Sequence, residues 1–243
     1  MSETDLSWLG TTVLVWAHPD DETYLSGGTA GSLVDLGHRV VAVTATRGEA
    51  GGPNTTPAAL AETAQVRTAE LDAAMRLLGV SEHVWLGYAD GCCAEADPEP
   101  AVGRLVGLFD DVRPDTVLTF GPDGFTGHPD HRTVSRWVDL ALARSIAAPR
   151  LLHAAATAQD RVDPELDADF GVFELGQPRM CELDELALRH VLEGASLRRK
   201  VAALQAQASQ TMGLVEAVGL ARFAAWVAVE GFADPVHAPA PAQ

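Results

Sequence analysis

The first half of the chain alternates short, continuously apolar segments with longer amphipathic ones, and this alternation limits the folds open to it. Residues 11–17 and 39–45 have the apolar, β-branched character of buried strands. Between them a helix is predicted to open at Gly27-Gly28 and to stop at Gly37, which suits the left-handed position after a helix end. Strands that alternate with helices form parallel sheets, so we expect an α/β fold with a doubly wound, mostly parallel sheet and helices on both faces.

The same pattern continues toward the C-terminus and then becomes less regular. Helical spacing and strand-like runs predict further helices over 60–78, 101–112 and 129–142, and further strands over 83–86 and 115–120. Beyond Pro149 we expect strands over 150–157 and 170–175, an acidic loop between them, and a helix over 195–209.

The chain is long enough for one large domain. Its 243 residues exceed the usual domain length of about 150, and no linker or internal repeat divides them. Hydrophobic residues make up 47% and charged residues 21%, which is close to globular usage and sufficient for a sizeable core. We expect a single domain over 1–243, with its core at 11–210 and a small C-terminal extension at 211–243.

The charge balance argues against several classes of partner. Asp and Glu total 34 against 17 Lys and Arg, a formal net charge of -17 that repels nucleic acid and anionic membranes. The sequence shows neither a signal peptide nor a long apolar run, so a cytoplasmic location is expected. Three cysteines without framework spacing fit a reducing compartment, and arginine-rich, lysine-poor usage suggests a bacterial source. Homo-oligomerisation is left open.

Two clusters of metal-binding side chains follow predicted strands. His18, Asp20, Asp21 and Glu22 come directly after the first strand, and His128-Pro129-Asp130-His131 follows the fourth. Parallel strands end on one side of a sheet, so the two clusters can meet in the ligand crevice. Catalytic zinc takes three protein ligands at about 2.0–2.2 Å and keeps one open position. Residue types and spacing alone leave the choice among these side chains open.

A family resemblance narrows this choice. The chain resembles the PIG-L/LmbE-like N-acetylglucosamine deacetylases, which are zinc-dependent amidohydrolases of amino-sugar conjugates. The resemblance covers residues 11–210 and is carried by motifs that occur in the family's order: His18-Pro19-Asp20-Asp21-Glu22, Thr46-Arg47-Gly48-Glu49, Arg67, Glu70-Leu71, Leu78-Gly79-Val80, Leu86-Gly87, Asp90-Gly91, Gly127-His128-Pro129-Asp130-His131, Lys200, Leu204 and Ser209-Gln210. The fold implied is Rossmann-like.

The resemblance also implies roles for individual residues. One zinc ion per chain would be bound by His18, Asp21 and His131, with another divalent ion as an alternative. Asp20 would be the general base. His128 would help to stabilise the oxyanion and would protonate the leaving amine. Arg67 and Asp90 match residues that hold the sugar in the family's mycothiol-pathway members.

Two further roles follow from physical reasoning. Asp130 is expected to orient His128 by a hydrogen bond, as carboxylates commonly do around metal sites. Arg47, in a glycine-rich loop after the second strand, is a candidate to contact substrate. Two positions depart from the family's pattern: Thr126 stands where the mycothiol-pathway members have tyrosine, and Gln207 where many members have histidine. We expect no catalytic role for Gln207.

The sequence thus predicts a zinc-dependent hydrolase that removes an N-acetyl group from an amino sugar or a sugar-linked small molecule, releasing acetate and a free amine. An amidase for a larger acyl or cysteinyl group of a thiol or sugar conjugate would use the same centre. A non-catalytic metal-binding or carbohydrate-binding protein ranks lower, because no candidate ligand or base is missing. A phosphoesterase is disfavoured because such enzymes often use two metal ions, and the two motifs contain too few ligand side chains for two complete metal sites.

Overall fold

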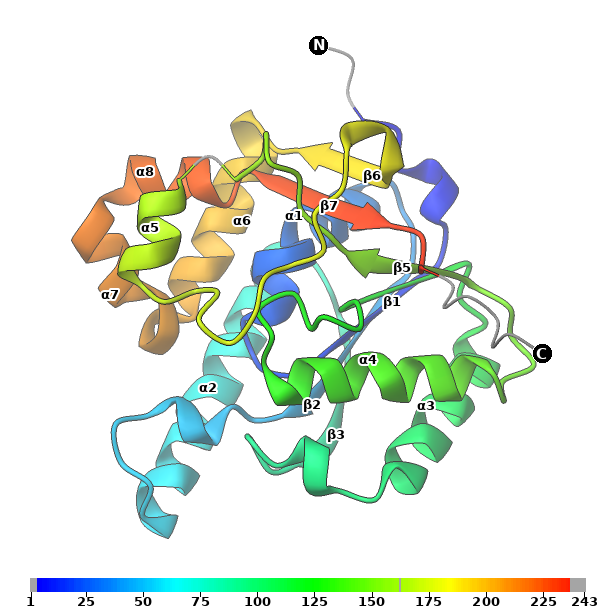
Figure 1. Ribbon diagram of the computed structural model, residues 1–243. Coiled ribbons are helices and arrows are strands. Elements are labelled where there is room, and N and C mark those ends of the chain that lie inside the picture. Colours follow the sequence, from blue (N-terminus) through cyan, green and yellow to red (C-terminus); the bar gives the residue numbers. More distant parts are fainter. Residues whose placement is uncertain (1–3, 162, 237–243) are drawn as a thin grey trace, which may run out of the picture.

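A seven-stranded sheet with the strand order β3-β2-β1-β4-β5-β7-β6 organises the protein (Figure 1). The computed structural model describes residues 4–161 and 163–236. The first five strands are parallel, whereas β7 runs antiparallel to both β5 and β6. The strands are β1 (Thr12–Trp16), β2 (Val40–Thr46), β3 (Glu82–Tyr88), β4 (Thr116–Thr119), β5 (Arg150–Ala154), β6 (Leu186–Val191) and β7 (Val229–Ala233). The predicted mostly parallel α/β sheet is confirmed.

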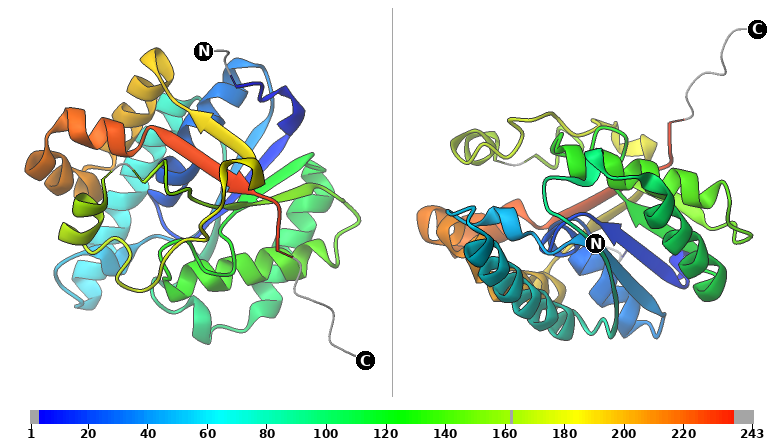
Figure 2. Two further views of the ribbon diagram at one scale, coloured as in Figure 1. Left: turned by 45° about the horizontal axis from the view of Figure 1, so that its top comes forward. Right: turned by 90° about the horizontal axis from the view of Figure 1, so that it is seen from below.

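Helices cover both faces of this sheet, as expected. In Figure 2, α1, α2 and α6 lie on one face, while α3 and α4 pack together on the other. The helices are α1 (Asp21–Asp35), α2 (Pro57–Leu78), α3 (Pro98–Val112), α4 (Pro129–Leu142), α5 (Pro164–Asp169), α6 (Gly194–Ala206), α7 (Ala208–Val218) and α8 (Leu220–Trp226). Every residue of β1, β2 and β4 is buried, which explains their continuous apolar sequences.

Helix α1 begins six residues earlier than the glycine pair suggested. It starts at Asp21, directly inside the first His-Asp cluster, and its first turn carries the acids Asp21 and Glu22, which suit the positive end of the helix dipole. Gly28 serves close packing instead, because a Cβ atom there would lie 2.3 Å from a methyl carbon of Leu192. The early start places Asp21 and Glu22 in the first turn of the helix, while His18 and Asp20 lie in the turn between β1 and α1.

The predicted strand over 170–175 is wrong. The structure has α5 just before it, where Pro164 occupies the first turn and the Asp163 side chain caps the helix by accepting the Leu166 amide. Residues 170–175 form turns, and pairing in this part of the described chain is limited to one isolated bridge between Ala156 and Met180. The acidic segment therefore contains a short helix.

The C-terminal segment is part of the main sheet. Strand β7 lies between β5 and β6, so residues beyond 211 complete the sheet as well as adding α7 and α8. The last residues of the predicted extension, 237–243, lie outside the described residues. Within the part of the chain that the structure describes, no helix has the length and apolar character needed to cross a bilayer.

A buried ion pair joins α1, α6 and β7. The Nζ atom of Lys200 lies 2.8 Å from Oε1 of Glu230, and both side chains are fully buried. Lys200 also donates to the Tyr24 carbonyl at 2.7 Å, while the Glu230 carboxylate accepts the amides of Gly28 and Thr29. Because removing one partner of such a pair leaves an uncompensated buried charge, the pair fixes how these three elements pack.

Candidate active site

The two His-Asp clusters meet at the carboxyl edge of the sheet. Strand β1 pairs in parallel with β4, with Leu14 opposite Leu118, so both strands end on the same side. His18 follows β1, and His131 lies in the first turn of α4 after β4. The clusters are therefore brought together from positions that are more than a hundred residues apart, at the edge where α/β folds usually bind ligands.

Three donor atoms from these clusters surround one point. Nδ1 of His18 lies 3.1 Å from Nε2 of His131, and each nitrogen lies 3.5 Å from Oδ2 of Asp21. A tetrahedral zinc ion with bonds of about 2.0–2.1 Å holds its ligand atoms about 3.3 Å apart. The spacing of the three atoms therefore fits three ligand positions of such an ion.

The remaining nitrogens of the two histidines face acceptors. Nε2 of His18 lies 3.0 Å from Oδ1 of Asp90 and 3.2 Å from Oδ2 of Asp130. Nδ1 of His131 lies 3.0 Å from the Gly124 carbonyl oxygen. A proton on each outward nitrogen leaves the inward nitrogen unprotonated, which is the form that binds a metal. Phe120 stacks on the His131 ring at 4.1 Å between ring centroids and fixes its plane.

Other donor groups near His18 fit a metal less well. His18, Asp90 and Asp130 also bring one donor atom each within 4.8 Å of one another. Both oxygens of the buried Asp130 carboxylate, however, accept backbone amides, from Gly91 at 2.8 Å and from Cys93 at 3.0 Å. Asp130 is thus occupied as a hydrogen-bond acceptor that supports His18.

This geometry corrects the expected role of Asp130. The carboxylate was expected to orient His128, but it contacts His18. The link to His128 runs through the backbone: the Asp130 amide donates to Nδ1 of His128 at 3.1 Å, so His128 caps the start of α4. In neutral His128 the proton is therefore on Nε2, which makes that nitrogen a hydrogen-bond donor.

Asp20 has an unusual backbone and a partly buried carboxylate. Its φ of 109° lies in the region that favours glycine, so the surrounding contacts must maintain this strained conformation. Arg67 lies 3.2 Å from Oδ2 of Asp20 and also donates to the carbonyls of Pro19 and Gly48. Burial raises the pKa of Asp20 to about 8, although the Arg67 guanidinium opposes this shift.

The three residues expected to bind substrate are engaged within the protein. Arg67 is only 4% exposed and lies beneath Asp20. Arg47 donates to Thr68 at 2.7 Å, and its guanidinium lies 4.4 Å from the centre of the Trp85 ring. Asp90 contacts His18 and accepts the Ala50 amide. In this structure Arg67 and Asp90 support the site residues, and their contact with substrate stays a prediction.

Gln207, for which no catalytic role was expected, is linked to the backbone of Asp20 by hydrogen bonds that share the Glu22 carboxylate. The buried Gln207 amide donates to Oε1 of Glu22 at 2.7 Å, and Oε2 of Glu22 accepts the Asp20 amide at 3.1 Å. The Gln207 carbonyl oxygen is buried without a hydrogen-bond partner. Gln207 is therefore placed to stabilise the strained backbone of Asp20.

We expect Gln207→Ala to lower kcat about tenfold, as losses of supporting hydrogen bonds around metal sites commonly do, with little change in zinc content. Gln207→His should retain more of the activity, because a ring N–H can replace the donor to Glu22. Gln205→Ala, which removes the same side chain two residues away on α6, is the matched control. Steady-state kinetics check this, and an unchanged kcat for Gln207→Ala would show that the contact is not needed.

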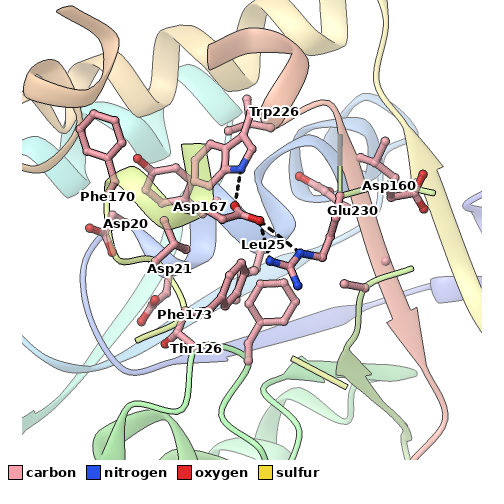
Figure 3. Close-up of a pocket in the computed structure, with 18 of the residues that line it drawn as sticks. Asp20, Asp21, Leu25, Thr126, Asp160, Asp167, Phe170, Phe173, Trp226 and Glu230 are labelled. Atoms are coloured by element: carbon pink, nitrogen blue, oxygen red, sulfur yellow. Dashed lines mark hydrogen bonds and ion pairs between the residues drawn. The ribbon is translucent and has the colours of Figure 1, made fainter. Parts of the chain in front are cut away.

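A cavity of about 560 Å³ opens beside the three donor atoms (Figure 3). We call it the chamber. Asp20, Asp21 and His131 line its metal end. The rest of its wall comes from α1, from the loop between β4 and α4, from the segment that contains α5, from α7 and α8, and from β7. Its apolar wall includes Tyr24, Leu25, Phe125, Phe173, Leu214 and Trp226. Sequence reasoning missed these residues because they lie on separate segments and share no motif.

The chain belongs to the PIG-L family. The family model described as GlcNAc-PI de-N-acetylase matches residues 13–142, more than half of the chain, and this range contains both His-Asp clusters. The resemblance recognised in the sequence is thus confirmed.

Curated relatives extend the similarity over most of the chain. A 1D-myo-inositol 2-acetamido-2-deoxy-alpha-D-glucopyranoside deacetylase from Acidothermus cellulolyticus is 34% identical over 229 residues, covering 82% of this chain and 78% of the relative. A protein of the same name from Actinosynnema mirum is 31% identical, covering 92% and 88% respectively.

Solved structures share the fold at low sequence identity. N,N'-diacetylchitobiose deacetylase from Pyrococcus horikoshii is 22% identical, with a TM-score of 0.64 over 94% of this chain and 86% of that one. GalB from Pseudomonas putida, a 4-carboxy-2-hydroxymuconate hydratase, is 16% identical, with a TM-score of 0.61 over 96% and 98%. Because one fold serves both reactions, the reaction of this chain must be argued from its site.

Proposed function

We propose that the protein hydrolyses the N-acetyl amide of an amino-sugar conjugate at a metal centre formed by His18, Asp21 and His131. The observation that carries this proposal is the set of three donor atoms, 3.1–3.5 Å apart, at the metal end of the chamber. The names of the relatives support the same reaction, since they describe deacetylases of an acetamido sugar.

Zinc is the ion we assign to this centre. Two imidazole nitrogens and one carboxylate oxygen are a common ligand set for catalytic zinc, which keeps a fourth position open. When bound, zinc lowers the pKa of a coordinated water toward ~7 and polarises the amide carbonyl. Metal analysis of the purified protein decides between zinc and another divalent ion.

Asp20 is the group we assign to receive the proton of the attacking water. Its carboxylate lines the chamber beside the ligand Asp21, and Arg67 holds one of its oxygens. The hydrogen bond from the Asp20 amide to Glu22 keeps the backbone in its unusual conformation. A carboxylate positioned in this way can act as a general base without being a metal ligand.

His128 is the group we assign to the developing oxyanion. Its ring centroid lies 4.8 Å from that of His18 and 5.0 Å from that of His131, and its Nδ1 accepts the Asp130 amide. Nε2 of neutral His128 therefore bears a proton, which can stabilise the developing oxyanion by a hydrogen bond. The expected donation of this proton to the amine would leave an imidazolate, because Nδ1 accepts the Asp130 amide. We therefore assign the proton of the departing nitrogen to Asp20, which has received it from water, and cleavage of the C–N bond then releases acetate and a free amine.

The test is the release of primary amine by zinc-loaded protein from a matched panel of N-acetylated amino-sugar conjugates. We expect turnover with stoichiometric acetate, because hydrolysis of an acetamide yields both products in equal amounts. The panel includes the same sugars with an N-cysteinyl or a longer N-acyl group.

Product analysis separates the alternatives. Amine release without acetate, from the longer acyl compounds alone, would replace deacetylation by the larger-acyl amidase. Bound zinc with no turnover on any amide would instead indicate a binding protein.

A further inference from the structure

The size of the chamber exceeds what an acetyl group needs. Its volume of about 560 Å³ lies within the range of about 300–1,000 Å³ that is typical of pockets for drug-sized ligands. It directly adjoins Asp20, Asp21 and His131, so a substrate bound at the metal end extends into it. A large part of the substrate besides the acetamide must therefore match the chemistry of its wall.

The wall away from the metal end is mainly aromatic and aliphatic. Tyr24 and Leu25 come from α1, Leu214 from α7 and Trp226 from α8, while Phe173 comes from the loop after α5. The indole N–H of Trp226 donates to Oδ1 of Asp167 at 3.0 Å (Figure 3). The one polar atom of the Trp226 side chain is therefore already satisfied within the protein.

Each charged side chain on this part of the wall has a partner inside the protein. Asp160 forms a two-pronged ion pair with Arg189, with a shortest distance of 2.6 Å. Arg161 pairs with Asp167 at 2.7 Å.

The fourth charged side chain on this wall, Glu230, is also paired within the protein. Glu230 pairs with the buried Lys200 and accepts two backbone amides. Figure 3 shows Asp160 and Glu230 on the side of the chamber opposite Asp20 and Asp21. No unpaired charge in this part of the described chain is therefore available to bind a charged ligand.

Few polar groups of the wall remain free for hydroxyl groups. Among the described lining residues away from the metal end, the uncommitted side-chain groups are the Tyr24 hydroxyl and the Gln210 carbonyl oxygen. A polyol buried against such a wall would find few uncommitted side-chain partners for its hydroxyl groups, and each hydroxyl left unpaired is costly. The inositol named for the curated relatives would be such a polyol.

We propose that the chamber binds an uncharged apolar group, aromatic or aliphatic, that the amino sugar carries as its aglycone. This inference rests on the proposed deacetylation. Because an acetyl group is too small to fill the chamber, the chamber is occupied by the part of the substrate on the amine side of the scissile bond. The substrate is then an N-acetylated amino-sugar glycoside whose aglycone packs against Phe173, Leu214 and Trp226.

The first experiment compares N-acetylglucosaminides that differ only in the aglycone: phenyl, inositol, a second sugar, or none. We expect kcat/KM for the phenyl glycoside to exceed that for the inositol glycoside at least about tenfold, the scale set by small apolar contacts in a pocket. Equal or better turnover of the inositol or disaccharide compound would overturn the assignment while leaving deacetylation intact. Preference for a long N-acyl chain on a sugar without aglycone would place the acyl group in the chamber and also overturn it.

A second experiment tests the wall itself with a matched pair of variants. Phe173→Asn should lower the ratio of kcat/KM for the phenyl glycoside to that for N-acetylglucosamine about tenfold. Leu175→Asn makes a similar change two residues along the same loop, at a side chain that is 61% exposed and outside the chamber, and should leave the ratio unchanged. An unaltered ratio in Phe173→Asn would contradict the proposal.

Binding to the metal-free protein gives a readout that does not depend on turnover. Titration calorimetry with the deacetylated phenyl glycoside should show binding with a negative heat-capacity change, which marks burial of apolar surface. Phe173→Asn should weaken this binding, and Leu175→Asn should not. Absence of binding to folded wild-type protein would overturn the proposed aglycone site. Absence of turnover on every acetamide would instead refute the proposed function.

Discussion

Replacement of His131 by alanine is expected to abolish tight zinc binding and, with it, turnover. The substitution removes one of three donor atoms that lie 3.1–3.5 Å apart, and also the ring on which Phe120 stacks. Loss of a supporting hydrogen bond alone costs about 10–100-fold in metal affinity, so loss of a ligand should exceed a hundredfold. The zinc content of purified protein and a competition titration with a chelator measure this effect.

His128→Ala is the informative companion of this variant. One nitrogen of His128 lies within 4.8 Å of a nitrogen of each of the other two site histidines, so a set of three histidines is the competing ligand assignment. If Asp21 completes the site, His128→Ala keeps its zinc and His131→Ala loses it. Retention of zinc by His131→Ala, or loss of zinc from His128→Ala, would show that the ligand set is wrong.

Asp20→Asn is expected to keep its zinc and to lose kcat by about 10²–10⁴-fold, the usual contribution of a positioned general base. The amide has nearly the same shape as the carboxylate and can still accept a hydrogen bond from Arg67, but it cannot take up a proton from water. Parallel measurement of zinc content and kcat separates loss of the base from loss of the metal.

A variant at the C-terminal end of α1 controls for the charge change. Asp35→Asn removes a carboxylate that pairs with Arg199 at the surface, far from the chamber lining, and should leave both zinc content and kcat unchanged. Full turnover by zinc-loaded Asp20→Asn would assign the base to another group.

The parallel half of the fold could be predicted because local sequence and burial agree there. The completely buried β1, β2 and β4 have continuous apolar sequences, and α2 ends at Gly79, whose φ of 79° suits the left-handed position. Strands β6 and β7 carry charged residues that obscure their pattern. In the folded protein Arg189 is paired with Asp160, and Glu230 with Lys200, but these partners are distant in the sequence.

The sequence predicted which residues form the site better than it predicted which residues they contact. The spacing of the two His-Asp clusters and the family resemblance identified the side chains that meet at the carboxyl edge. Adjacency in the sequence then misled the assignment of Asp130, whose carboxylate turns toward His18 and the amides of Gly91 and Cys93. The contact of Gln207 with Glu22 spans 185 positions, so no local pattern could indicate it.

Because Lys200 is buried, its chemical labelling can measure how often the surrounding helices and strand separate. Lys200 is the only lysine in the sequence, and its fully buried ammonium group contacts Glu230 and the Tyr24 carbonyl. An amine-directed acylating reagent can reach this side chain only when α6 or β7 separates from α1. The rate at which such a reagent labels Lys200 therefore reports how often the elements behind the chamber come apart.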